Sequence, residues 1–151
     1  KLFDLKSELI DTYFDTLDDN KFRIKPPLKS KVCFSMANMI PQRPNNNRVA
    51  WRMIEDTVHD KAMMLSATNS IYVITGVIYN DNVWLKDIRV PNIIYKAVYS
   101  TDGKMAGVFI AENNDTRTYT TISIKQFEET YGIIVFPSLS NEARNMIKLT
   151  R

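Results

Sequence analysis

The stretch FSMANMIPQ (Phe34–Gln42), followed by NRVAWRMIE (Asn47–Glu55), decides the fold of this chain. An apolar run that ends in a polar loop, and then gives way to helical spacing, predicts a strand end, a loop and a helix start in series. Asparagine is favoured at helix starts, so Asn47 is predicted to cap the helix. The side chains of Asn38, Asn47 and Glu55 are expected to converge where a hard metal ion and a phosphate could bind. No other part of the sequence gathers polar groups in this way.

The composition is that of one folded domain. The chain has 151 residues, of which 44% are hydrophobic and 11% aromatic, and this is enough to bury a core. Its single cysteine, Cys33, excludes an internal disulfide. The net charge of +3 permits a phosphate-rich partner without requiring one, and the densest basic run lies within residues 21–31. No apolar run is long enough to cross a bilayer and no signal-peptide pattern is visible, so no membrane partner is expected, and the compartment stays unknown.

Periodicity predicts an α+β domain with a mixed or antiparallel sheet flanked by helices. Helices are expected at residues 2–20, 47–65, 122–131 (starting after Ser123) and 141–149, and strands at 32–36, 70–79, 93–99 and 105–111. The helix that starts at Asn47 is expected to bury a stripe of apolar side chains: Val49, Met53, Ile54, Val58, Ala62 and Met63. The single domain 1–151 would then comprise an atypical N-terminal helix and basic linker (1–31), a core (32–141) and a C-terminal helix (142–151).

The polar residues of the opening stretch suit divalent-metal chemistry. Mg²⁺ prefers oxygen ligands and keeps most of its water shell, so the side-chain oxygen of Asn47 could hold it while Glu55 orients a water. Three arginines lie close by and could clamp a phosphodiester: Arg43, Arg48 and Arg52. The plainer alternative is an asparagine-rich loop, a helix cap and a solvent-facing glutamate. On spacing alone, the plainer alternative is favoured.

The same segments resemble the signature of the DNA/RNA non-specific endonucleases, the ββα-metal (His-Me finger) nucleases that include the Serratia-type enzymes and endonuclease G. The matching positions are Asn38, Pro41, Gln42, Asn47, Trp51 and Glu55, whereas Ala37 replaces the family's hydroxyl residue. The similarity continues through VPNIIYKAVY (Val90–Tyr99) and SIKQFEETYG (Ser123–Gly132). It covers about residues 32–141, and several motifs in the right order make it specific.

The resemblance implies a role for each matching residue. Asn47 would bind a single Mg²⁺, or another divalent cation such as Mn²⁺, directly. Glu55 would hold a metal-bound water, and Asn38 would order the hydrogen bonds around the site. Arg43, Arg48 and Arg52 are expected to contact the nucleic acid because of their position, and His59 could also touch it, since some relatives carry a basic residue near there. The expected activity is hydrolysis of phosphodiester bonds in DNA and RNA, and a homodimer or an inhibitor protein stays open as a further partner.

One family element has no counterpart in the sequence. The family carries an Asp-Arg-Gly-His segment about thirty residues before the metal asparagine, and it supplies the histidine that activates water. At that distance this chain has FDTL (Phe14–Leu17), and its only histidine, His59, follows Glu55 by one helical turn. Either the sequence is incomplete or the chain is a degenerate relative that binds nucleic acid or assembles without cutting. The retention of Asn38, Asn47 and Glu55 favours an active enzyme.

Overall fold

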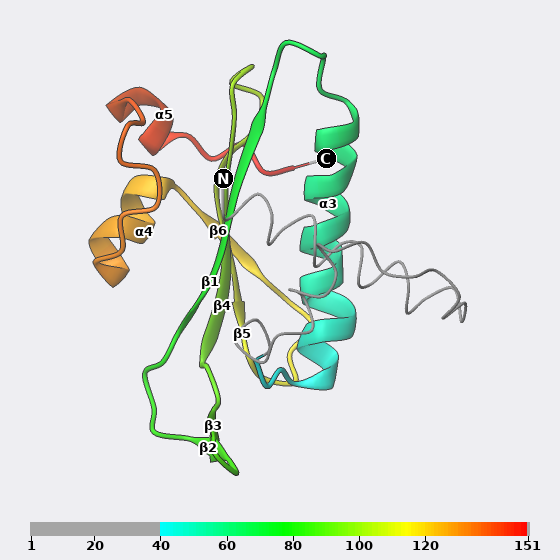
Figure 1. Ribbon diagram of the computed structural model, residues 1–151, viewed down its shortest axis with the longest axis vertical. Coiled ribbons are helices and arrows are strands. Elements are labelled where there is room, and N and C mark those ends of the chain that lie inside the picture. The colour runs from blue at the N-terminus through cyan, green and yellow to red at the C-terminus, as the bar shows by residue number, and fades with distance from the viewer. Residues whose placement is uncertain (1–39, 151) are drawn as a thin grey trace.

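The computed structural model describes residues 40–150, which form a three-layered α+β domain (Figure 1). The predictions made for residues 1–39, which include Asn38, lie outside this range. The middle layer is an antiparallel sheet in the order β1-β4-β5-β6. Its strands are β1 (Ile71–Ile78), β4 (Ile93–Ser100), β5 (Ala106–Glu112) and β6 (Thr120–Ile122). Of the two arrangements expected for the sheet, the antiparallel one is therefore correct for the described strands.

Helices cover both faces of the sheet. The helical turn η2 (Asn46–Trp51) and the helix α3 (Arg52–Met63) lie along one face, whereas α4 (Ile124–Tyr131) and α5 (Asn141–Asn145) lie on the other (Figure 1). Two apolar clusters follow from this arrangement. On the α3 face, the buried residues include Trp51, Ile54, Val58, Val73, Ile94, Val98 and Phe109. On the α4 face, they include Tyr95, Ala97, Val108, Ile110, Ile124 and Phe127.

Local signals predict α4 and the central strands correctly. The Ser123 hydroxyl accepts a hydrogen bond from the backbone N–H of Gln126, and the Gln126 side chain accepts one from the backbone N–H of Ser123. This reciprocal capping box starts α4, and Gly132 ends it in the left-handed conformation at φ +67°. The three predicted strands that fall within the described range begin and end within one residue of their expected limits.

Two predictions about helices are wrong. The last helix ends at Asn145 rather than at residue 149, because Lys148 exchanges two backbone hydrogen bonds with Ala106, of 2.8 and 3.1 Å, and so continues the sheet. In α3, the side chains of Met53 and Met63 are 48% and 74% exposed, although they were expected in the buried stripe. Ile54 and Val58 of the predicted stripe are buried, and Trp51 and Thr57, which were not predicted, are buried with them.

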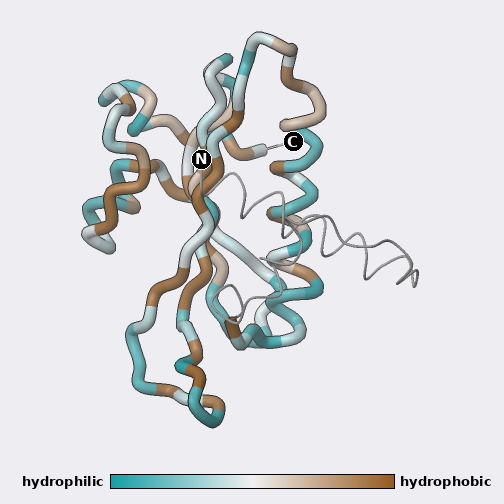
Figure 2. Tube along the Cα trace, in the orientation of Figure 1, coloured by the Kyte–Doolittle hydropathy of each residue, from teal (hydrophilic) through white to brown (hydrophobic). Residues whose placement is uncertain are grey.

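A short hairpin lies between β1 and β4. Its strands are β2 (Trp84–Leu85) and β3 (Ile88–Arg89), and they are joined by a two-residue turn in which Lys86 has φ +54°. The hairpin extends beyond the end of the main sheet (Figure 1), and both apolar and hydrophilic residues occur along it (Figure 2). Trp84 and Leu85 are more than half exposed.

The described residues contain no helix that is both long enough and apolar enough to span a bilayer.

Gly76 on β1 is required by close packing on the α4 face. It pairs with Tyr95 of β4, and a Cβ at position 76 would lie 2.3 Å from the Tyr95 hydroxyl oxygen. The Tyr95 ring cannot easily move away, because it packs against Phe127 with 4.6 Å between ring centroids. Burial also raises the pKa of the Tyr95 hydroxyl above 10.0, so this side chain stays neutral at ordinary pH.

We therefore expect Gly76→Ala to lower the free energy of unfolding by about 1–3 kcal/mol through overpacking. Urea denaturation followed by circular dichroism would measure the change. The double variant Gly76→Ala/Tyr95→Leu should lose less than the sum of the two single variants, because the shorter side chain relieves the clash. If the two losses of stability simply add, the contact with Tyr95 is not the reason why position 76 requires glycine.

Candidate active site

The helix that carries Asn47 begins earlier than the sequence predicts. Residues 44–45 already have helical geometry, the π-helical turn η2 starts at Asn46, and the backbone N–H of Asn47 donates to the carbonyl of Arg43 at 2.9 Å. Asn47 therefore lies inside the helical run and does not cap it, so the capping prediction is wrong. Pro44 can open the helix because its fixed φ suits a first turn and its missing N–H is not needed there.

The π-helical turn changes the angle between Asn47 and Glu55. In a regular α-helix of 3.6 residues per turn, a residue eight positions on lies roughly 80° further around the axis. A π-helical turn contains more residues, so each residue turns the chain through a smaller angle. Half of the steps from Asn47 to Glu55 lie within η2, which ends at Trp51. The π turn therefore brings these two side chains closer to one face than an unbroken α-helix would.

Two buried or partly buried amides hold the start of this helix on the sheet. Asn46 is fully buried, and its Nδ2 donates to the carbonyl of Glu112 at the end of β5, at 2.6 Å. Asn113, the next residue along, accepts from the backbone N–H of Arg43 at 2.8 Å. Its Nδ2 donates to the carbonyls of Pro41 and Pro91, at 2.9 and 2.8 Å. The segment before Asn47 is thus fixed to β5 and to the start of β4.

Sequence reasoning missed both of these amides. Their partners lie 66 to 72 residues away, except for the Pro91 carbonyl at 22 residues, so no local pattern indicates the contacts. The available signal was the position of Asn113 directly after a strand, where side-chain amides commonly satisfy loop backbone groups.

Glu55 lies close to a buried lysine that the sequence analysis did not assign to the site. The Glu55 side chain is 11% exposed, and its Oε1 lies 3.9 Å from Nζ of Lys96, whose side chain is 1% exposed. The same Nζ lies 5.2 Å from the centroid of the Trp51 ring, and Trp51 itself is a core residue, 4% exposed. The signal for Lys96 was a single cation within an otherwise apolar strand.

The basic residues assigned to nucleic acid lie near the same helix start. Arg43, Arg48 and Arg52 are all exposed, and Arg43 directly precedes the helical run. His59 follows Glu55 by one turn of α3, is 59% exposed, and has its Nδ1 3.9 Å from a carboxylate oxygen of Asp60. The structure therefore brings Asn47, Glu55 and His59 onto one helix, with the arginines around its first turns. Asn38 lies outside the described residues.

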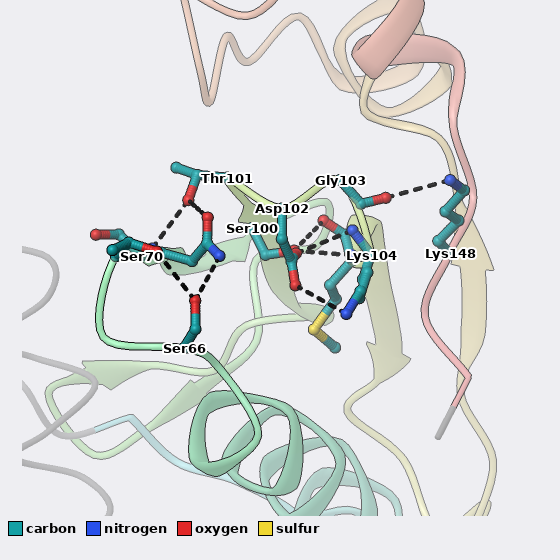
Figure 3. Close-up of polar contacts among 11 residues, drawn as sticks. Ser66, Ser70, Ser100, Thr101, Asp102, Gly103, Lys104 and Lys148 are labelled. Atoms are coloured by element: carbon teal, nitrogen blue, oxygen red, sulfur yellow. Dashed lines mark hydrogen bonds and ion pairs between the residues drawn. The ribbon is translucent and has the colours of Figure 1, made fainter.

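A second polar cluster lies at the opposite end of α3, and it has a structural role (Figure 3). The Ser100 hydroxyl donates to Asp102 at 2.6 Å, and the backbone N–H of Lys104 donates to the same carboxylate oxygen at 3.0 Å. These two bonds, in that order, lower the pKa of the Asp102 carboxyl. Lys148 adds a bond from its Nζ to the carbonyl of Gly103 at 3.2 Å. Together they close the β4–β5 turn.

The shallow pocket beside this turn is too small to be a substrate site. Its volume is about 100 Å³, and it is lined by residues such as Lys61, Met64 and Asp102. Ordinary small-molecule sites have roughly 300–1,000 Å³. The helix start around Asn47 is therefore the better candidate for chemistry.

The donors at the helix start fit a hydrated hard cation rather than a caged one. Within residues 40–150, no group of three or more His, Cys, Asp or Glu side chains could hold a metal ion. Mg²⁺ does not need such a cage, because it commonly takes one or two protein oxygens and keeps several waters. Asn47 is partly exposed and can offer an amide oxygen, and Glu55 on the same helix offers a carboxylate.

The protein is an α+β domain in which oxygen donors and exposed arginines gather at the start of one helix. The chain matches the model of the DNA/RNA non-specific endonuclease family over residues 26–142, and it belongs to that family. No curated protein and no solved structure matched the chain. Family membership makes the protein a hydrolytic nuclease, and it confirms the resemblance and the α+β nuclease fold expected from the sequence.

Asn113 provides a direct test of how the site is held. We expect Asn113→Ala to lower the free energy of unfolding by about 2–4 kcal/mol, since three hydrogen bonds of about 1 kcal/mol each are lost. Amide hydrogen exchange at Arg43 should become faster, because its N–H loses its acceptor. Asn114→Ala is the matched control, since within residues 40–150 the Asn114 side chain bonds only to Glu112 and Thr116, at the surface. Unchanged exchange at Arg43 in Asn113→Ala would contradict the assigned role.

Proposed function

We propose that this nuclease requires Mg²⁺ or a similar divalent cation, and that Asn47 is the protein's direct ligand to it. Glu55 then orients a water of the ion's hydration shell. The observation that carries the proposal is the placement of Asn47 and Glu55 on one helix whose first turn is tied down by Asn46 and Asn113. A ligand must be held within a fraction of an ångström to bind a small ion well, and a buried anchor provides that precision.

The chain's own residues have distinct tasks in this proposal. Arg43, Arg48 and Arg52 bind the phosphates on either side of the bond that is cut, since guanidinium groups match phosphate oxygens in geometry and charge. Phosphates are identical in every base sequence, so such contacts suit a substrate-tolerant enzyme that acts on both DNA and RNA. When bound, the divalent cation would stabilise negative charge on the leaving oxygen. Asn38 is proposed to order the hydrogen bonds of the site.

The three consecutive asparagines allow a matched experiment. Asn47→Ala should lower the cleavage rate of plasmid DNA and of RNA by at least about 100-fold with little change in stability, because the ion loses several kcal/mol of favourable interaction. Asn46→Ala should lower the free energy of unfolding by about 1–3 kcal/mol, because it leaves a carbonyl without its donor. Asn45→Ala is the control, since Asn45 makes no side-chain cap bond to the helix.

Chelation by EDTA should abolish the wild-type cleavage, and added Mg²⁺ should restore it. Full activity of the Asn47→Ala variant would overturn the metal assignment. A wild-type chain that binds nucleic acid but cuts neither DNA nor RNA would instead support a degenerate relative.

His59 is proposed to contact the nucleic acid rather than to activate water. Its ring is 59% exposed and lies one turn beyond Glu55. An exposed contact of this kind contributes roughly 1 kcal/mol or less, so His59→Ala should lower kcat/KM by less than about tenfold. The pH dependence of cleavage should keep its shape. A loss greater than about 1,000-fold, together with a flattened pH profile, would identify His59 as the general base.

A further inference from the structure

Lys96 is a charged side chain buried in the middle of the sheet. It is one of the largest fully buried side chains among residues 40–150 and is 1% exposed. Alternation along β4 places it on the α3 face, between Ile94 and Val98, which both belong to the apolar cluster there. Removing an ammonium group from water costs several kcal/mol in a real protein, so its surroundings must compensate for this cost.

The groups around Lys96 are a small polar island on an apolar face. Oε1 of Glu55 is buried and lies 3.9 Å from its Nζ, and the Trp51 ring contributes a cation–π contact at 5.2 Å. Thr75 of β1 is the cross-strand partner of Lys96 and shares its face, and the Thr75 hydroxyl is buried with no hydrogen-bond partner among the described residues. Stability alone does not explain such a cluster, because apolar residues of similar volume often serve as well as a buried ion pair.

We infer that Lys96 is a positioning residue of the nuclease centre, and this inference rests on the metal site proposed above. Its ammonium attracts Oε1 of Glu55 towards the sheet and so fixes the rotamer of the carboxylate. The Glu55 carboxylate is then held in one orientation relative to the hydration shell of the ion bound by Asn47. Because β4 is a central strand, paired with β1 and with β5, it offers Lys96 a rigid base from which to fix Glu55.

The test is to measure Mn²⁺ binding from the electron paramagnetic resonance signal of the free ion. This measurement does not depend on cleavage activity. Lys96→Met keeps the side-chain length but removes the charge, and we expect it to weaken Mn²⁺ binding by about 10- to 100-fold, as is typical when a group that orients a metal site is lost. Lys104→Met is the control. Lys104 also pairs with a carboxylate at 3.9 Å, that of Asp102, but its side chain is 78% exposed and belongs to the β4–β5 turn.

A double-variant comparison separates positioning from general stability. If Lys96 acts through Glu55, then Lys96→Met/Glu55→Gln should bind Mn²⁺ within about threefold of Glu55→Gln alone. Independent losses that multiply would overturn the inference. So would wild-type Mn²⁺ affinity in Lys96→Met. If that variant does not fold, Lys96→Gln is also uncharged and is expected to show the same loss.

The same experiment distinguishes this inference from the function on which it rests. A wild-type chain that takes up no Mn²⁺ would remove the proposed metal site and the inference with it. A wild-type chain that binds Mn²⁺, with Lys96 variants that bind it equally well, would leave the metal site intact and overturn only the positioning role.

Discussion

The attachment of residues 41–46 to the end of β5, through the side-chain amides of Asn46 and Asn113, is the contact on which the proposed site depends. A loop that enters a helix has backbone groups that need partners, and the Asn113 amide, directly after a strand, serves two of them, the N–H of Arg43 and the carbonyl of Pro41. The Asn46 amide adds a bond from the helix start to the carbonyl of Glu112. The direction of α3, and with it the place of Asn47 and Glu55, follows from this attachment. Arg43 belongs to this segment, and Arg48 and Arg52 follow it in η2 and at the start of α3.

The two faces of the sheet differ in the polarity of the side chains that they bury. On the α4 face, Tyr95 and Phe127 form part of a continuous apolar cluster, which holds the layers together. On the α3 face, the apolar cluster is interrupted by Lys96, Thr75 and Glu55, next to the helix that carries Asn47. A protein built only for stability would not need this interruption. Both faces thus bury apolar clusters, and the buried charges lie on the face that carries the proposed site.

The sequence predicted those features whose causes are local. Ser123, Gln126 and Gly132 lie within one turn of the ends of α4 and suffice to define it. The central strands are predicted by their β-branched and aromatic residues. Features with distant causes were mispredicted or missed. The helix start at Asn47 looked like a cap because the attachment of Asn46 to Glu112, 66 residues away, cannot be seen in a window of sequence. The pairing of Lys148 with Ala106, which shortens α5, also joins residues that are far apart in the sequence.

The candidate site was predicted in its residue types but only partly in its geometry. The spacing of Asn47 and Glu55 placed both on one helix, as the structure does, yet the π-helical turn that brings them closer to one face has no simple sequence signature. Lys96 was noticed only as part of a family motif, because an isolated lysine in a strand does not reveal which face it occupies. That information required the register of β4 against β1 and α3.

The long reach of the Asn46 and Asn113 contacts has a consequence for the order of events during synthesis. The segment 41–46 cannot be secured until Glu112 and Asn113 exist, so closure of a long loop must precede assembly of the helix start. A nascent chain that has not yet reached the end of β5 carries the residues proposed for metal and phosphate but no means of holding them in place. A ribosome making a nuclease is itself an RNA particle. Dependence on the end of β5 would delay cutting until that strand had been translated.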